Sequence, residues 1–409
     1  MAFQPVLRFA ALSDIHLKDT PTVERTRLAQ AIDTAVALCA GDAAFHPVLD
    51  AFCVVGDFAN RGTETQFQAM KDILDAHLPA ETKLILTCAG HDYRFSIEGI
   101  QPVRTRVAEI FGIPHNIHTV INGYHFIAMS TGRSNTARFD GFDEEKRAFY
   151  RHAIAEAEAD HPTRPIFAFQ HPHPEKTCYG SEKWGTEDLL DIQKEHPRLV
   201  IFSGHSHAPI NDPRSIDQQD FTSIGTGSLS YFELDEFDKV YGTVPPGAHL
   251  AAQFHLVEAD AAGCVRITPY DLITNRPFCE PILLGPVWDR EHFVCTPNRP
   301  GAEAVPYFQA TDRLTVVSAG SSAVTFHFPQ AQTDAFRVNA YYASIRTADG
   351  TEVKRESVWS GYYFNDMPPM MHWRIEGLQP GTTYTLTVEA ESFWHRHSAP
   401  LETTFTTAL

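Results

Sequence analysis

Hydrophobic runs alternate with helical patterns through residues 1–275. The runs predict strands over residues 7–12, 51–55, 84–88, 124–130, 165–170, 198–203, 220–225, 251–259 and 264–272. Between several of them, apolar positions recur at helical spacing, which predicts helices over residues 22–40, 63–78, 143–159 and 186–196. Strands separated by helices favour a layered α/β fold with a mainly parallel sheet.

The pattern changes near residue 276. Segment 276–306 is rich in proline, which predicts a connection between domains. Residues 307–409 then carry short alternating runs and no helical pattern, as expected for a β-sandwich. We therefore expect a first domain over residues 1–275, a connection over 276–306 and a second domain over 307–409. The chain length of 409 residues also favours more than one hydrophobic core.

The stretch GLQPGTTYTLTVEA at residues 377–390 resembles the fibronectin type III pattern. The resemblance implies an immunoglobulin-like sandwich in which Leu378, Pro380 and Gly381 form the turn before a strand. It also implies that Tyr384 is the corner tyrosine of the fold. Two roles for this domain stay open at this point: it caps or orients the first domain, or it binds a protein partner.

Composition narrows the partners and the compartment. The formal net charge of −18 repels polyanions, which argues against a nucleic-acid scaffold role but leaves a small phosphate ester as substrate. No apolar run reaches the roughly 18 residues that a membrane span needs. The seven cysteines are scattered, several of them in apolar runs, as expected for buried thiols in a reducing compartment. The apolar N-terminal run predicts a core strand rather than a signal peptide, so we expect a cytoplasmic protein.

Polar residues that can bind metal follow several of the predicted strands. The pieces are Asp14-Ile15-His16, Gly56-Asp57, Gly90-His91-Asp92, His171-Pro172-His173 and Gly204-His205-Ser206-His207. In open α/β sheets, ligands bind beyond the carboxyl ends of the strands, so these side chains are expected to meet. Residues two apart in extended chain point to the same side, which predicts that both members of Asp-x-His and His-x-His face one site.

Each piece alone is a poor indicator, because a chain with 21 histidines produces an Asp-x-His triplet by chance. A lone histidine is more often a core or surface residue than a ligand. Five such pieces in one order, each after an apolar run, are hard to obtain by accident. His173 is expected either to orient His171 or to be a plain loop residue. His115, His118, His395 and His397 lack the strand-end context and are expected to be structural or exposed.

The ordered set resembles the calcineurin-like metallophosphoesterase family: Asp-x-His, Gly-Asp, Gly-Asn-His-Asp, a later His, then Gly-His-x-His. The resemblance covers roughly residues 7–275 and implies an αββα sandwich with two metal ions. One ion would be held by Asp14, His16 and His207 and the other by His171 and His205, with Asp57 between them. Mixed carboxylate and imidazole ligands suit divalent or trivalent iron, manganese or zinc rather than calcium.

The resemblance also implies a reaction. A metal-bound hydroxide would attack phosphorus, and His91 would protonate the leaving alkoxide as general acid. Asn60 stands where some family members carry an aspartate beside this histidine, and its amide is expected to hydrogen-bond His91. The expected activity is therefore hydrolysis of phosphoesters, with phosphodiesters preferred.

Loop residues near these pieces are further candidates. Arg61 is expected either to reach a phosphate oxygen or to be a solvated loop residue. Tyr179, Trp184 and Arg214 flank the later histidines and are candidate substrate contacts, with packing as the alternative.

One position departs from the family pattern: Gly90 stands where the family has an asparagine that binds the second ion. Three outcomes follow. Water or substrate replaces the amide and the second ion binds more weakly, or only the first ion binds, or catalysis is lost and the protein serves as a binding or scaffold protein. We favour the first outcome, because the other six ligands and His91 are all present.

Overall fold

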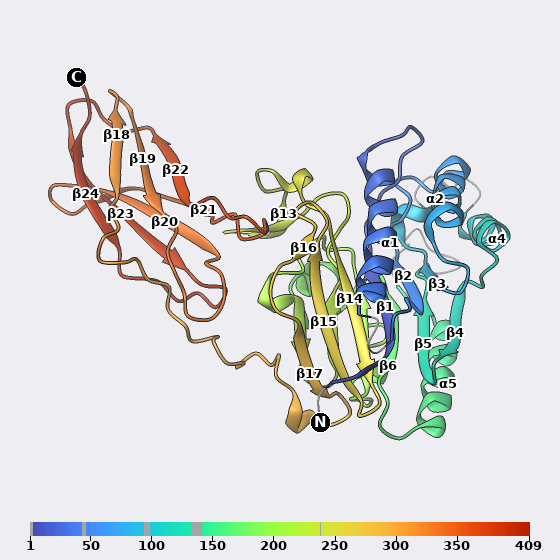
Figure 1. Cartoon of the computed structure of the whole chain (residues 1–409). Coiled ribbons are helices and arrows are strands. Elements are labelled where there is room, and N and C mark those ends of the chain that lie inside the picture. Colours follow the sequence, from blue (N-terminus) through green and yellow to red (C-terminus); the bar gives the residue numbers. More distant parts are fainter. Residues whose placement is uncertain (1–2, 43–45, 94–98, 133–140, 238) are drawn as a thin grey trace. The chain divides into compact units, whose positions relative to one another are not determined.

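The computed structural model describes residues 3–42, 46–93, 99–132, 141–237 and 239–409 (Figure 1). Its contacts divide the chain into two compact units, Met1–Pro297 and Asn298–Leu409. The division lies inside the segment 276–306, and each unit has its own hydrophobic core.

The first unit contains two sheets packed face to face. One has the strand order β16-β15-β14-β1-β2-β3, with β17 also pairing with β15. Strands β1, β2 and β3 are parallel, whereas β14 and β15 are antiparallel to their neighbours. The bounds are β1 Pro5–Leu12, β2 Ala51–Val55, β3 Lys83–Thr87, β14 Gln253–Asp260, β15 Cys264–Asp271, β16 Arg276–Pro277 and β17 Ile282–Pro286.

The other sheet has the order β10-β11-β9-β6-β5-β4. Its four central strands are parallel, and both edge strands are antiparallel. The bounds are β4 Asn116–Ile121, β5 Tyr124–Met129, β6 Ile166–Gln170, β9 Leu199–Ser203, β10 Ile216–Gln218 and β11 Thr222–Gly225. Short paired strands outside both sheets are β7 His173–Pro174 with β8 Gly185–Thr186, and β12 Leu234–Glu236 with β13 Lys239–Thr243.

Aromatic packing holds the two sheets together. The ring of Phe9 on β1 meets the rings of Phe126, Phe167, Phe169 and Phe202 edge-on, with centroids 4.8 to 6.0 Å apart. All five side chains are buried. Because the inner strands are covered on both faces, their sequences are continuous hydrophobic runs. These runs are the reason that the strands could be predicted from the sequence.

Helices cover the outer face of each sheet. Apolar residues of α1 Val23–Gly41, α2 Glu64–His77 and α4 Ile100–Phe111 join the outer core of the first sheet. Those of α5 Glu144–Asp160 and α7 Leu190–Gln193 cover the second. The expected αββα sandwich is therefore confirmed. Thr63 caps α2 by accepting the Gln66 N–H at 3.3 Å. No helix among the described residues is long and apolar enough to cross a bilayer.

Three elements differ from the sequence expectation. Helix α4 was not predicted, since Pro102 interrupts its pattern, but proline is tolerated in a first helical turn. The helix expected over residues 186–196 shrinks to the single turn of α7. The start of segment 276–306 is not a loop, because β16 and β17 pair with β15 at the sheet edge, where proline can be accommodated.

The second unit is an immunoglobulin-like β-sandwich. Its sheets have the orders β18-β19-β22 and β21-β20-β23-β24. Tyr384 is buried and its Oη accepts the Gln379 N–H at 3.1 Å, the contact expected of a corner tyrosine. The bounds are β18 Thr315–Ala319, β19 Ala323–Pro329, β20 Ala340–Thr347, β21 Glu352–Trp359, β22 Met370–Glu376, β23 Thr383–Glu391 and β24 Leu401–Thr406.

Candidate metal centre

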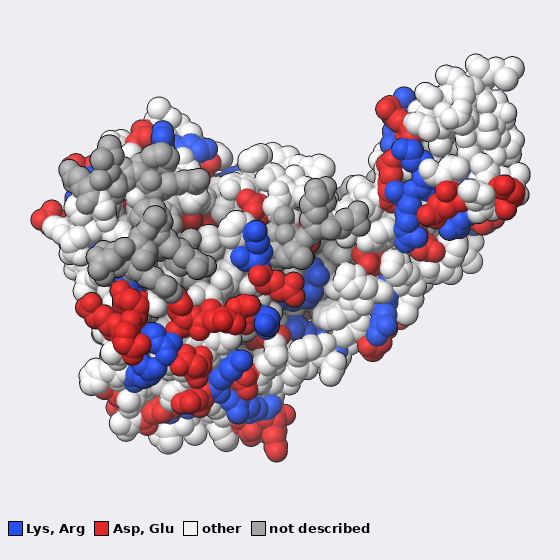
Figure 2. Space-filling model, turned by 180° about the vertical axis from the view of Figure 1, so that it is seen from behind, with Lys and Arg blue, Asp and Glu red and all other residues white. Residues whose placement is uncertain are grey.

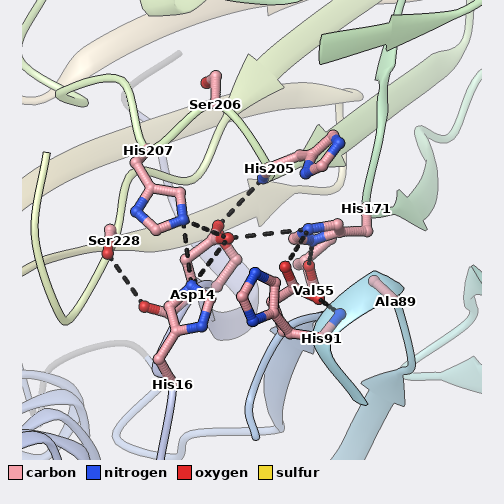
Figure 3. Close-up of polar contacts among 12 residues, drawn as sticks. Asp14, His16, Val55, Ala89, His91, His171, His205, Ser206, His207 and Ser228 are labelled. Atoms are coloured by element: carbon pink, nitrogen blue, oxygen red, sulfur yellow. Dashed lines mark hydrogen bonds and ion pairs between the residues drawn. The ribbon is translucent and has the colours of Figure 1, made fainter. Parts of the chain in front are cut away.

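The polar residues that follow β1, β2, β3, β6 and β9 meet at one place in the first unit. Figure 3 shows Asp14, His16, His91, His171 and His207 converging from strand ends of both sheets. Two groups of candidate metal ligands form there: Asp14, His16 and His207, and Asp57, His171 and His205. The ligand atoms within each group lie within 4.8 Å of one another. All six residues that were predicted as ligands because they follow the carboxyl ends of strands (the strand-end rule) therefore lie close together.

The backbone reaches this arrangement by left-handed turns rather than by extended chain. Five of the nine described non-glycine residues with positive φ are in the two groups: Asp14 (52°), His16 (54°), Asp57 (50°), His205 (72°) and His207 (53°). The explanation by strand alternation was therefore wrong, although the convergence it predicted is present. Left-handed conformations cost about 1–2 kcal/mol per residue and persist where the surroundings enforce them, often at functional sites.

Buried Asp92 supplies part of that enforcement. Its carboxylate accepts the backbone N–H groups of Asp57 at 3.0 Å, Ala59 at 2.9 Å and Ala89 at 2.9 Å. These bonds tie the loop after β2 to the loop after β3. Asp92 follows His91 in the motif, and its hydrogen bonds hold both loops in place.

Two glycines allow the chain to approach the ligands closely. A Cβ on Gly56 would lie 2.6 Å from His171 Nδ1, and one on Gly204 would lie 2.6 Å from Asp14 Oδ2. Both distances are too short for a side chain, so these strand exits require glycine.

The first group points hydrogen-bond acceptors at one another. His207 Nδ1 lies 3.0 Å from the Tyr231 carbonyl, to which it donates, so in the neutral ring its Nε2 carries a lone pair. That Nε2 is 3.1 Å from Asp14 Oδ1 and 3.1 Å from His16 Nε2. Acceptors at such distances repel unless a proton or a metal ion lies among them, so the donor set fits a cation.

The second group has the same arrangement. His171 Nδ1 donates to the Val55 carbonyl at 2.7 Å, and its Nε2 lies 3.1 Å from Asp57 Oδ2 and 3.7 Å from Asp14 Oδ1. The His205 ring is 4.9 Å from the His171 ring. Within the described residues, His171 Nε2 and Asp14 Oδ1 are buried without a hydrogen-bond partner. Buried polar atoms without partners are rare in folded proteins, and a metal ion would satisfy both.

The charges of the centre set its protonation when no ion is bound. Burial lowers the pKa of His171, but the carboxylates of Asp57 and Asp14 raise it more, to about 10. The pKa of Asp57 is held well below its usual range, since the effect of burial is outweighed by His171. A proton on His171 therefore takes the place that a metal ion would occupy.

We expect metal binding to release this proton. Because the pKa of His171 is raised to about 10, the imidazolium form dominates below that pH and competes with the ion. Affinity at this group should rise by about tenfold per pH unit between about pH 7 and pH 10. Calorimetric titration with Mn²⁺ at pH 8, in two buffers of different ionisation enthalpy, should show about one proton released. Equal heats in both buffers would mean that His171 is already neutral.

His91 lies beside both groups. Its main-chain N–H donates to Asp57 Oδ1 at 2.9 Å, and its ring meets the His16 ring edge-on at 4.5 Å. Its Nδ1 is 3.0 Å from the main-chain carbonyl of Asn60. The expected contact with the Asn60 side-chain amide is thus replaced by a contact with the carbonyl. An Nδ1 that donates leaves Nε2 as the nitrogen that exchanges a proton.

The candidate substrate contacts separate into two kinds. The Trp184 ring lies 4.7 Å from the His205 ring, at the edge of the second group. Arg214 instead stacks over Tyr179 at 4.0 Å and binds the buried Asp212 carboxylate with both Nε and Nη2. Tyr179 Oη accepts the Asp235 N–H at 2.9 Å. These contacts favour the packing interpretation for Tyr179 and Arg214. Arg61 is exposed, and its main-chain N–H bonds Gln66 Oε1.

Several residues that contact the candidate ligands were not predicted from the sequence. Ser13 Oγ donates to Asp14 Oδ2, and Ser228 Oγ donates to the Asp14 carbonyl at 3.0 Å. The Tyr231 ring lies 4.4 Å from the His207 ring. Ser228 and Tyr231 follow the end of β11, so the strand-end rule would have found them if it had been applied to that strand. His173 is buried between the hydroxyls of Ser203 and Ser206, and it braces the loop after β9.

Comparisons with known proteins agree with this geometry. Residues 7–209 match the family model described as calcineurin-like phosphoesterase. A probable cyclic nucleotide phosphodiesterase, RPA0124 of Rhodopseudomonas palustris (strain ATCC BAA-98 / CGA009), is 31% identical over 216 residues. The match covers 50% of this chain and 73% of that protein.

Two solved structures match a quarter of the chain. One is a redesigned β-sandwich protein, 17% identical with a TM-score of 0.19, matched over 25% of this chain and 89% of its own. The other is FN3tt, 13% identical with a TM-score of 0.19, matched over 25% and 96%. These scores add nothing to what the strand pairing of the second unit shows.

Proposed function

Because this chain belongs to the calcineurin-like phosphoesterase family, we propose that it is a metal-dependent hydrolase of phosphodiesters. The observation that carries the proposal is the centre itself. Carboxylate and imidazole acceptors from two groups face one another with buried atoms that lack partners in the described residues. That donor set suits iron, manganese or zinc.

Two ions are proposed, one for each group. Asp14, His16 and His207 would hold the first, and His171 and His205 the second, with Asp57 shared between them. Asp14 Oδ1 is 3.1 Å from His207 Nε2 and 3.7 Å from His171 Nε2, so this carboxylate also reaches towards both groups. When bound, such ions polarise a phosphate oxygen and lower the pKa of water towards neutrality.

His91 would supply the proton that the reaction needs. Hydrolysis of a phosphodiester expels an alkoxide, which is a poor leaving group until it is protonated. The Asn60 carbonyl fixes the His91 ring through Nδ1, and the Asp57 carboxylate fixes its main chain. A histidine held at both ends in this way can carry its mobile proton on Nε2 and donate it to the leaving oxygen.

The preference for diesters rests on two supports. The relative RPA0124 is described as a probable cyclic nucleotide phosphodiesterase. The Trp184 ring next to His205 offers an apolar surface to the second organic group that a diester carries.

The direct test is turnover by the purified chain of 409 residues. Loaded with manganese, it should hydrolyse bis(p-nitrophenyl) phosphate faster than p-nitrophenyl phosphate. Iron and zinc are compared in parallel, and bound metal is measured in each sample. Absence of turnover with both ions bound would contradict the proposed hydrolase activity and favour a binding role.

Replacing Gly90 with asparagine should strengthen the second metal site. Gly90 begins the short helix α3 Gly90–Tyr93 and is absent from the residues with positive φ, so its backbone suits asparagine. The added amide oxygen would give the His171 group the donor that other family members have. We expect the second ion to bind about ten- to hundredfold more tightly, by competition with a chelating dye. Gly112→Asn, at the left-handed end of α4, is the matched control and should change nothing. Equal affinities in all three proteins would show that position 90 does not reach the ion.

A further inference from the structure

A second polar cavity lies away from the metal centre, between α4 and α5. Its volume is about 350 Å³, a size typical of small-molecule sites. The lining residues come from both helices and from β4: Gln101, Arg104, Thr105, Ala108, His115, Asn116, Glu145 and Lys146. None of the six candidate metal ligands contributes to it.

Positive charge is concentrated in this cavity. Lys146 is only 3% exposed, yet no ion pair of its ammonium group is found within the described residues. Arg104 donates Nη2 to the Gly132 carbonyl at 3.1 Å, while its Nε is buried without a partner there. The only carboxylate among the lining residues is that of Glu145, which is exposed. A buried cation without a counter-ion, such as Lys146, is costly, so the cavity is suited to an anion.

Neutral polar atoms complete the lining. Both ring nitrogens of His115 and the Asn116 Oδ1 are buried without partners among the described residues. Burial and the charges of Lys146 and Arg104 lower the pKa of His115 to about 2, so its ring is neutral and presents one N–H donor. Burial and Arg104 lower the pKa of Lys146 to about 8, against Asp143 and Glu145, so the amine is still largely charged at pH 7. His115, expected to be merely structural or exposed, is thus part of a second polar site.

The positive charge of the cavity contrasts with the acidic balance of the whole chain. The chain has a formal net charge of −18. On the face in Figure 2, Asp and Glu side chains form broad patches interrupted by smaller groups of Lys and Arg. Non-specific attraction of anions to such a surface is small, so an anion bound here would owe its affinity to Arg104, Lys146 and the His115 N–H group.

We propose that this cavity binds a small phosphorylated compound, whose phosphate group lies between Arg104 and Lys146. A guanidinium group presents a planar fork that matches phosphate oxygens, and an ammonium group adds a point charge. The cavity is larger than a phosphate group, which leaves room for an organic group beside the polar side chains of Gln101 and Asn116.

The test is calorimetric titration of inorganic phosphate into the metal-loaded protein. The wild type should show one binding event at the cavity beside any event at the metal centre. Lys146→Met, which keeps the volume and removes the charge, should weaken the cavity event by about tenfold or more. Arg104→Gln should act in the same direction. Lys194→Met removes an exposed charge and is the matched control. Phosphate heats that are the same in all four proteins would overturn the proposal.

A second measurement guards against misfolding. Without phosphate, Lys146→Met should melt at the same temperature as the wild type or higher, because an unpaired buried charge is removed. Phosphate should raise the melting temperature of the wild type more than that of the variant. A variant that melts lower, with an equal gain from phosphate, would show that Lys146 is structural only. Neither measurement needs turnover, so the result is independent of whether the chain is a phosphodiesterase.

Discussion

Replacing His91 with glutamine should lower turnover of alkyl phosphodiesters by about 10²–10⁴-fold. The variant removes the proposed proton donor while keeping a polar side chain of similar reach. The loss should be much smaller for bis(p-nitrophenyl) phosphate, because p-nitrophenolate leaves without protonation. Steady-state rates for the two substrates, at equal metal content, give the comparison.

Asn60→Ala is the matched control for this prediction. The Asn60 main-chain carbonyl, and not its side chain, lies 3.0 Å from His91 Nδ1, so alanine preserves the contact. We expect the alanine variant to stay within about threefold of the wild type, well below the loss for His91→Gln. An equal loss for both ester types in His91→Gln would show that His91 acts on the metal site rather than on the leaving group. A large loss in Asn60→Ala would restore a role for the amide.

Replacing Asp14 with asparagine should have the largest effect of any single change. Its carboxylate receives the His205 N–H at 3.1 Å and the Ser13 hydroxyl, and it faces Nε2 of His207. The neutral amide keeps the shape but loses the charge and turns an N–H group towards one of these partners. We expect loss of tightly bound metal and a fall in turnover of at least about 10³-fold, several kcal/mol of barrier.

Metal content by mass spectrometry and turnover should fall together in Asp14→Asn. Asp19→Asn, in the same loop but exposed and bonded to Thr63, is the control and should keep both. If Asp14→Asn keeps wild-type metal content and turnover, the first group is not a metal site.

The strand-end rule explains how much of the site the sequence revealed. Parallel strands deliver their carboxyl ends to one edge, so residues as distant as Asp14 and His207 could be expected to meet. The continuous hydrophobic runs identified the buried strands for the same reason, since both faces of each sheet are covered. The candidate ligands at the strand ends and the buried strands themselves can therefore both be predicted from the sequence.

Other features depend on geometry that local patterns do not encode. The left-handed turns at Asp14 and His205 are stabilised by contacts between residues far apart in the chain. One such contact is the hydrogen bond from the His205 N–H to the Asp14 carboxylate. The use of the Asn60 carbonyl instead of its amide depends on loop shape. The cavity beside Lys146 is lined by residues from two helices and one strand, and one of these helices, α4, was not predicted.

The central claim is that two metal ions lie among the six ligands, even though glycine stands at position 90, where the motif that this chain resembles has asparagine. Crystals of the manganese-loaded protein, measured for anomalous scattering at the manganese edge, test it most directly. Two peaks are predicted, one beside Asp14, His16 and His207 and a lower-occupancy one beside Asp57, His171 and His205. A peak at only one group, or no peak at either, in crystals whose metal content has been measured, would contradict the account.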